Sequence, residues 1–545
     1  MPEVGTRSSP GPRAGRAIVA ATLLGALLRF FDLGGHPLWL DENATFIDIH
    51  TLFGRGPDSP VFVQGSNLLY YTLLWGWAQI FGESEAALRS LSALAATACI
   101  PFAALLARRF GGDRAAVVCA VLVAVHPLHI HYAREARGYA LWTLLLLVAI
   151  AALWRAATSN NTRAWATAAL AWLLAFGAHV FTAFALPVTA AAILWADDRA
   201  RASRSWLAFA ATTGSTMLVY AVVVLAPSLG EGTGVWLEGT FEPLGAIAQS
   251  LWALLPSGDY PLHIHSLSLD SMKSRPWVSD WVAMLAALVP IILVTLGLVI
   301  LSTRQTSAAH ADWRPLAALA LGPLLLQWIV SWGTPVYFVA RYDMIAWPAW
   351  IVWIALGIAS LGVANSRRGT LVVALLVACA AVPSIRALRY TGGEGWHRER
   401  GHAISHATRP GDLVITFSDD DDLLAHSLSQ NGFEADLRTF PGWLARQIAF
   451  LDTRRDLSPE RTEDLARDAA QLQAQVEATL ARGARVVWVN DSESHVARSP
   501  RAPLFERLAA QFASAGIERI PFDTHSELYV LEKRQASEPS LPPPK

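Results

Sequence analysis

The chain has 545 residues, of which 53% are hydrophobic and only 16% are charged, and it contains 22 tryptophans. This balance is far from that of a soluble globular domain and is typical of a membrane protein. The formal net charge of −1 argues against a nucleic-acid partner, because binding to a phosphate backbone needs a basic surface. The cysteines Cys99, Cys119 and Cys379 lie inside apolar runs, so they indicate neither a disulfide framework nor a metal site.

Apolar segments that could cross a bilayer recur between residue 16 and about residue 390. Since a membrane-spanning helix needs about 20 apolar residues, the sequence predicts an α-helical polytopic membrane protein with about 11 transmembrane helices. The first segment has no small-residue cleavage site after it, so we expect a retained signal anchor. The predicted spans begin near residues 16, 85, 115, 138, 164, 180, 205, 278, 315, 343 and 370.

The basic residues between these spans predict the orientation of the chain. Lys and Arg are enriched in cytoplasmic loops, and most of the arginines between spans fall on one side if the amino terminus is cytoplasmic. Arg108, Arg109 and Arg155 are examples. The loop after the first span then lies outside, and an odd number of spans places the carboxy terminus outside as well.

The composition changes after about residue 396, where short strand patterns alternate with helical ones. This alternation predicts an extracytoplasmic α/β domain. The strand patterns cover residues 410–417, 484–491, 517–523 and 527–533, and the helical patterns cover residues 421–430, 459–481 and 502–516. The predicted organisation is a disordered cytoplasmic tail (1–15), a transmembrane catalytic domain (16–390), the α/β domain (396–535) and a disordered tail (536–545).

Polar clusters gather on the predicted outer side of the membrane. A charged side chain at the bilayer centre costs about 2.5–3.5 kcal/mol on insertion scales, so such clusters lie at an interface or serve a function. We expect four segments to converge on one outer face. They are "WLDENATF" after the first span, Arg89 at the start of the second, "HPLHIHYAREARGY" after the third and "YFVARYD" before the tenth.

The neighbouring carboxylates Asp41 and Glu42 open this set. If the loop is extended, the two side chains point to opposite sides and cannot flank one glycosidic bond as a hydrolase pair does. One carboxylate is sufficient when the leaving group is a phosphate and only the attacking hydroxyl must lose a proton. Arg89, Arg137 and Arg341 could hold that phosphate. The alternative interpretation is that the segment caps a helix.

The histidines of the third cluster raise the question of a metal. In an extended strand His129 and His131 share a face, and with Glu135 they could ligate a divalent cation. The alternative is that His126, His129 and His131 form hydrogen bonds at the level of the lipid headgroups. The predicted chemistry requires no cofactor.

Together these motifs resemble the bacterial glycosyltransferase family 39 group. The resemblance rests on "LWLDE", "LLYYTLLWGWAQIFGESEAALRSLSAL", "HPLHIHYAREARGYAL" and "ARYDMIAWPAW", in this order. The group consists of membrane enzymes of the GT-C fold, similar to protein O-mannosyltransferases and the lipid A aminoarabinose transferase. It implies a sugar, most commonly mannose, carried on a polyprenyl phosphate. The sugar would pass with inversion to an acceptor hydroxyl of a protein, lipid or polysaccharide outside the bacterial inner (plasma) membrane.

The resemblance also implies roles for individual residues. Asp41 matches the family's catalytic base, Glu42 its acceptor-side carboxylate, and Arg89 the arginine that enters the second span. The chain departs from the family at Arg134, where Gln is usual, and at Ser66-Asn67, where a Pro-Pro pair is usual. The residues expected to bind the donor are Arg89, Arg134, Glu135, Arg137, Tyr139, Arg341 and Tyr342.

A transporter or flippase of lipid-linked sugars would present a similar basic pocket and is the alternative function. Such proteins usually carry interrupted helices near the membrane midplane and related halves, and the sequence shows no sign of either. A third interpretation makes the carboxy-terminal domain a binding module anchored by an inactive membrane region. The complete motif set counts against it.

Overall fold

The computed structural model divides the chain into two compact units, which are described separately. The helical unit comprises Met1–Gly35 and Asp48–Tyr390, and the sheet unit comprises His36–Ile47 and Thr391–Lys545. The structure describes residues 10–36, 38–39, 41–42, 45–46, 48–49, 67–159, 161–196, 204–225, 250, 253–255, 314–333, 336, 341–364, 366–389, 396–416, 428, 436–439, 459–491, 517–521 and 526–531.

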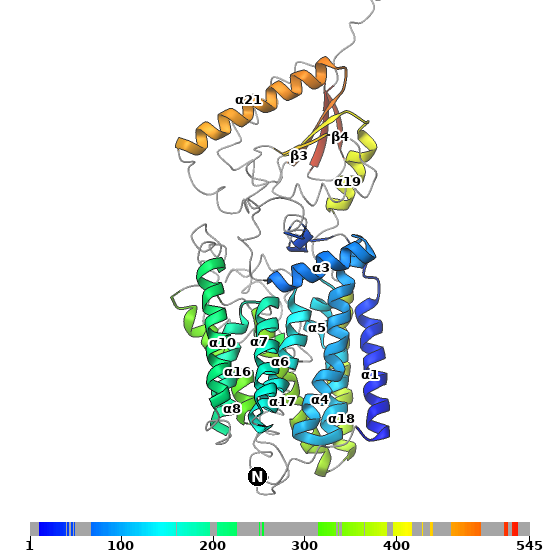
Figure 1. Cartoon of the computed structure of the whole chain (residues 1–545). Coiled ribbons are helices and arrows are strands. Elements are labelled where there is room, and N and C mark those ends of the chain that lie inside the picture. The colour runs from blue at the N-terminus through cyan, green and yellow to red at the C-terminus, as the bar shows by residue number, and fades with distance from the viewer. Residues whose placement is uncertain are drawn as a thin grey trace, which may run out of the picture. The chain divides into compact units, whose positions relative to one another are not determined.

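The helical unit is built from helices that begin close to the predicted spans (Figure 1). The span predicted near residue 278 lies outside the described residues. The helices are α1 (Pro12–Phe30), α3 (Leu68–Phe81), α4 (Glu85–Val125), α5 (Pro127–Ala133), α6 (Tyr139–Ser159), α7 (Thr162–Ala178), α8 (Thr182–Ala196), α10 (Arg204–Tyr220) with the π-helical turn η2 (Ala221–Leu225), α16 (Arg314–Val330), the 3-10 turn η5 (Tyr342–Ile345), α17 (Trp347–Ala364) and α18 (Ser366–Arg389).

Several of these helices have the character of membrane spans. Within the described residues, Glu85–Val125, Tyr139–Ser159 and Arg204–Val223 are 3 helices long and apolar enough to cross a membrane, and further apolar helices are shorter. Leu23 and Leu27 of α1 and Ile80 of α3 are exposed, as expected of side chains that face lipid. The total of about eleven spans stays a prediction.

The second and third predicted spans appear as one element, α4, with a break inside it. Gly112 has φ 70° within an otherwise helical stretch. Residues with a Cβ rarely adopt this left-handed conformation, whereas glycine does so at little cost. The break therefore coincides with the "FGGD" segment that separates the two apolar runs.

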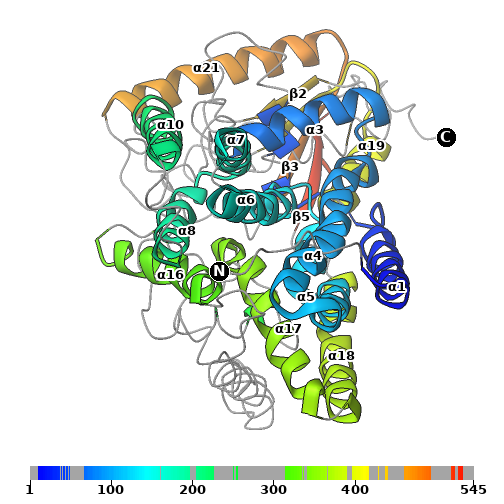
Figure 2. The same cartoon turned by 60° about the horizontal axis from the view of Figure 1, so that its bottom comes forward.

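Helices α1 and α4 lie side by side (Figures 1 and 2) and are joined by the buried Arg29. Its guanidinium donates to the carbonyl oxygens of Val123 at 2.8 Å and Ala124 at 2.9 Å, and it meets His129 Nδ1 at 2.8 Å. The last carbonyls of a helix have no intrahelical donor and form the negative end of its dipole. Arg29 satisfies the carbonyl groups of Val123 and Ala124 near the end of α4 and so links α1, α4 and α5.

The sheet unit contains a five-stranded mixed sheet of order β2-β1-β3-β5-β4. Strand β1 runs parallel to β2 and β3, and β5 runs antiparallel to β3 and β4. The elements are α19 (Trp396–Ala407), β1 (Leu413–Thr416), β2 (Asp436–Thr439), α21 (Pro459–Ala481), β3 (Val486–Asp491), β4 (Ile517–Pro521) and β5 (Ser526–Leu531).

Most sequence predictions for this region can be compared with these elements. The four predicted strands and the helix predicted at 459–481 are present. Strand β2 was not predicted, because "DLRT" has one apolar residue and no strand pattern of its own. The helices predicted at 421–430 and 502–516 lie outside the described residues, apart from Leu428.

The core of the sheet unit forms where strands and helices meet. Val414, Val487 and Val530, from β1, β3 and β5, are buried together with Ile404 of α19. Neighbouring strand residues such as Leu413, Ile415 and Val486 point to the other face and are also buried. Both faces of the parallel strands are therefore covered, as is usual where helices pack on a sheet.

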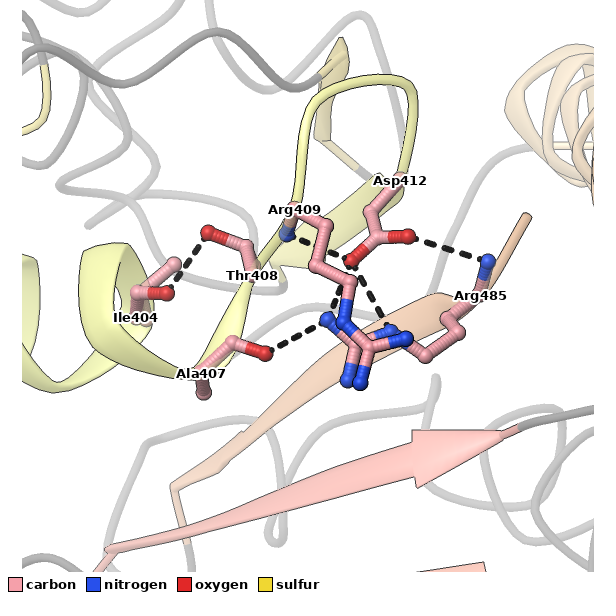
Figure 3. A network of polar contacts seen from close by, with 6 residues as sticks. All are labelled: Ile404, Ala407, Thr408, Arg409, Asp412 and Arg485. Carbon is pink, nitrogen blue, oxygen red and sulfur yellow. Dashed lines mark hydrogen bonds and ion pairs between the residues drawn. The ribbon is translucent and has the colours of Figure 1, made fainter.

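A buried ion pair connects α19, β1 and β3 (Figure 3). The Asp412 carboxylate accepts hydrogen bonds from the backbone N–H groups of Arg409 (2.8 Å) and Arg485 (3.1 Å) and from Arg485 Nη2 (2.7 Å). Arg485 Nη2 also donates to the carbonyl oxygen of Ala407 at 2.8 Å. Buried charges are tolerated when they are paired and fully hydrogen-bonded, so this pair fixes where the strands begin.

Replacing Asp412 by alanine should destabilise the sheet unit, because it leaves the buried Arg485 without its carboxylate. We expect a loss of about 3–5 kcal/mol in the free energy of unfolding. Hydrogen–deuterium exchange of β1 and β3 in the full-length protein measures it. Glu477→Ala, at an exposed position of α21, is the control and should change stability by less than about 0.5 kcal/mol. Equal protection of the strands in both variants would contradict the assignment.

Candidate functional site

The predicted site residues are divided between the two units. Asp41 and Glu42 fall in the sheet unit. The residues in the helical unit are Arg89, Arg134, Glu135, Arg137, Tyr139, Arg341 and Tyr342.

Asp41 and Glu42 are helical, so the condition of an extended loop does not hold and the alternative of a helix cap gains support. Glu42 is buried and its Oε2 accepts a hydrogen bond from the backbone N–H of Trp39 at 3.2 Å. A Glu that reaches back three residues to a free N–H is the reciprocal half of a capping box. The physical reason for the helical turn is therefore local, and capping is the role that the structure gives to Glu42. Asp41 is half-buried.

Arg89 and Arg134 both bind the main chain of the turn that follows α1. Arg89 Nη1 donates to the carbonyl oxygen of Leu33 at 2.8 Å. Arg134 donates to the carbonyl oxygens of Phe31 and Asp32 and, at 3.2 Å, to that of Leu388. These bonds shape the turn, so both residues have a structural role. Their expected role in binding the donor stays a prediction.

The segment 127–133 is the helix α5, so the extended strand expected for its histidines is wrong. Residues two positions apart on a helix do not share a face. The side chains of His129 and His131 therefore point in different directions. His129 stacks on Trp347 with ring centroids 4.3 Å apart, whereas His131 Nε2 lies 2.9 Å from Glu135 Oε1. His126 Nε2 is 3.2 Å from the carbonyl oxygen of Leu254. The described residues contain no group of three or more candidate metal ligands.

Two predicted motifs meet at Tyr139. The guanidinium carbons of Arg137 and Arg341 each lie 6.0 Å from the centroid of its ring. Tyr342, which follows Arg341, belongs to the same group through its contact with His179. Residues about 200 positions apart in the sequence are thus brought together as the polar clusters predicted. Two guanidinium groups beside aromatic faces form a site suited to an anionic group.

The bend that presents Arg137 is closely packed. Ser92 Oγ donates to the carbonyl oxygen of Arg137 at 3.0 Å. A Cβ on Gly138 would lie 3.1 Å from Asn67 Oδ1 and 3.2 Å from the carbonyl oxygen of Ala178. Any larger residue would push the bend away from its neighbours, so the position of Arg137 depends on this glycine.

His179 is a member of this group that the sequence reasoning missed. Its ring stacks on Trp142 at 4.3 Å and lies 5.4 Å from that of Tyr342. Burial lowers the pKa of His179 to about 3, and the charges of Arg137 and Arg341 act in the same direction. A single histidine between two apolar segments, with no spacing to another ligand, gives no sequence signal.

The sequence motifs also missed Asp48, which belongs to the helical unit. Its carboxyl group is buried and interacts with Arg137 and Tyr71. Burial raises the pKa of Asp48 to about 7, while the Arg137 charge and a hydrogen bond from Tyr71 oppose the shift. A carboxyl group that interacts with Arg137 therefore changes its charge near neutral pH.

The raised pKa of Asp48 predicts a pH-dependent stability. Between the unfolded value of about 4 and the folded value of about 7, the folded protein keeps a proton that the unfolded chain releases. Stability should therefore fall as the pH rises through this window, by up to about 1.4 kcal/mol per pH unit. In thermal unfolding of the detergent-purified protein, Asp48→Asn should have a flatter profile than the wild type. Parallel profiles from pH 5 to 7 would refute the assignment.

Comparisons with known proteins show a family model that matches part of the chain and solved structures of similar fold. Residues 66–226 match the family model of dolichyl-phosphate-mannose-protein mannosyltransferase. The chain is similar to the crystal structure of ArnT from Cupriavidus metallidurans bound to undecaprenyl phosphate, at 13% identity and TM-score 0.51, over 94% of this chain and 97% of that chain. No curated protein matches the chain.

A second similar structure is the oligosaccharyltransferase of Archaeoglobus fulgidus tethered with an acceptor peptide. The identity is 13% and the TM-score 0.49, over 97% of this chain and 75% of that chain. At such identities a structural match shows the fold alone, and the mannosyltransferase match adds a sequence relationship for residues 66–226. The resemblance that the motifs carry is therefore confirmed by a sequence match to the mannosyltransferase family model over residues 66–226 and by a fold similar to that of ArnT.

Proposed function

We propose that the chain is a membrane glycosyltransferase that moves a sugar from a polyprenyl-phosphate donor to an acceptor hydroxyl. The reaction takes place on the extracytoplasmic side of the bacterial inner membrane, and mannose is the first sugar to test. The observation that carries the proposal is the position of Arg137 and Arg341, each 6.0 Å from the Tyr139 ring. The similar ArnT structure contains undecaprenyl phosphate, a lipid phosphate of the proposed class.

The arginine pair acts on the departing phosphate. When the bond between the anomeric carbon and the phosphate oxygen breaks, its electron pair passes to that oxygen. The lipid phosphate then gains a negative charge. Arg137 and Arg341 stabilise this developing charge, which in a partly buried site is worth more than in water. A phosphate is a good leaving group, so no general acid is needed.

Asp41 is the proposed base at the acceptor. It takes the proton from the acceptor hydroxyl while that oxygen forms the new bond to the anomeric carbon. Attack on the side opposite the phosphate inverts the configuration. Glu42 supports the helical turn that carries Asp41 through its hydrogen bond to the Trp39 N–H group. The assignment of Asp41 rests on the motif resemblance.

The membrane contributes by positioning the donor. A polyprenyl tail held among apolar helices confines its phosphate to the region near the lipid headgroups. Because of this confinement, the donor phosphate meets the enzyme at a fixed depth and orientation instead of by free diffusion in three dimensions.

Asp41→Asn should abolish transfer, because an amide cannot accept the proton. We expect a loss of about 10²–10⁴-fold in the transfer rate. The assay follows radiolabel from a polyprenyl-phosphate sugar in reconstituted vesicles, and the thermal unfolding midpoint reports folding. Glu477→Gln, the same kind of change at an exposed position of α21, is the control and should retain wild-type transfer.

Wild-type transfer rates in a folded Asp41→Asn variant would disprove the assignment of the base. Movement of the lipid-linked sugar across the vesicle membrane without any covalent product would favour the transporter or flippase.

A further inference from the structure

His179 lies between α7 and α8 and is surrounded by aromatic rings of the candidate site. It stacks on Trp142, and its ring centroid lies 5.7 Å from that of Tyr139 and 5.4 Å from that of Tyr342. Trp142 is held in turn, because its Nε1 donates to Thr182 Oγ1 at 2.7 Å. The orientation of the imidazole is therefore fixed from several elements.

A hydrogen bond determines which nitrogen of His179 carries the proton. The backbone N–H of Phe181 donates to Nδ1 at 3.3 Å, so Nδ1 is the acceptor. Burial and the two neighbouring arginines lower the pKa of His179 to about 3, and the ring is therefore neutral at physiological pH. A neutral ring with Nδ1 as acceptor carries its hydrogen on Nε2. Within the described part of the chain, no group accepts a hydrogen bond from Nε2.

We propose that His179 binds the lipid-linked donor by donating its Nε2–H group to an oxygen of the phosphate. This inference rests on the proposed function and names a further residue of the same site. Arg137 and Arg341 supply the positive charge, and His179 adds a directed hydrogen bond without a third cation that would have to be desolvated. A hydrogen bond to a charged oxygen is stronger than one between neutral groups.

The competing explanation is that His179 only fills space among aromatic rings. Two substitutions separate these roles. His179→Phe keeps a planar ring that can stack on Trp142 but has no donor. His179→Gln loses the ring but can place an amide N–H close to the position of Nε2.

Binding of undecaprenyl phosphate to the full-length protein in lipid nanodiscs tests the proposal. This probe has a phosphate but no sugar, so it separates a phosphate contact from a contact to a sugar hydroxyl. Undecaprenol, which lacks the phosphate, is the second probe. His402→Phe, at an exposed position of α19, is the control variant.

We expect His179→Phe to bind undecaprenyl phosphate at least about tenfold more weakly than the wild type. His179→Gln should remain within about threefold, and undecaprenol should bind all variants equally. His402→Phe should match the wild type. Wild-type affinity in His179→Phe, or an equal loss in both His179 variants, would overturn the proposal while the proposed function stands. A wild-type protein that binds no undecaprenyl phosphate would contradict the proposed function itself.

Discussion

The structure of the helical unit depends on how it accommodates buried arginines. Arg29 and Arg134 direct their guanidinium groups at main-chain carbonyl oxygens, which satisfy the N–H groups but carry only partial charge. Arg137 and Arg341 lie beside the face of Tyr139. Positive charge thus collects where the helices end, and a lipid phosphate is the kind of group that such a site favours.

The buried arginines fall into two groups, which differ in whether they bind main-chain carbonyl groups or lie beside aromatic rings. Arg29, Arg89 and Arg134 hold the junction of α1, α4 and the turn that follows α1. Arg137 lies in a tightly packed bend, and Arg341 directly precedes the turn η5. Both lie near the aromatic group that includes His179. Anchoring the first group by the main chain fixes the helices from which the second group would act on the proposed donor phosphate.

Much of the fold could be predicted from the sequence, and the failures have a common cause. The length of the apolar segments predicted most helices, and the strand patterns predicted four of the five strands. Hydrophobic burial determines those elements. At the short polar segments the sequence left an extended loop and a helix cap open for Asp41, and it considered a strand where α5 is a helix. Asp41 and α5 are helical because of a local cap and of contacts to Arg29 and Trp347 that are distant in sequence. The motifs found Arg137 and Arg341, whereas His179 and Asp48 are recognised only through their neighbours.

The most direct test of the central claim is a donor panel. Membranes that contain the protein are given radiolabelled sugars on polyprenyl phosphate, and the label is followed into protein, lipid and polysaccharide fractions. If the chain is a polyprenyl-phosphate-dependent glycosyltransferase, one sugar leaves its lipid and becomes covalently attached in one fraction. Label that stays on the lipid with every donor would contradict the account.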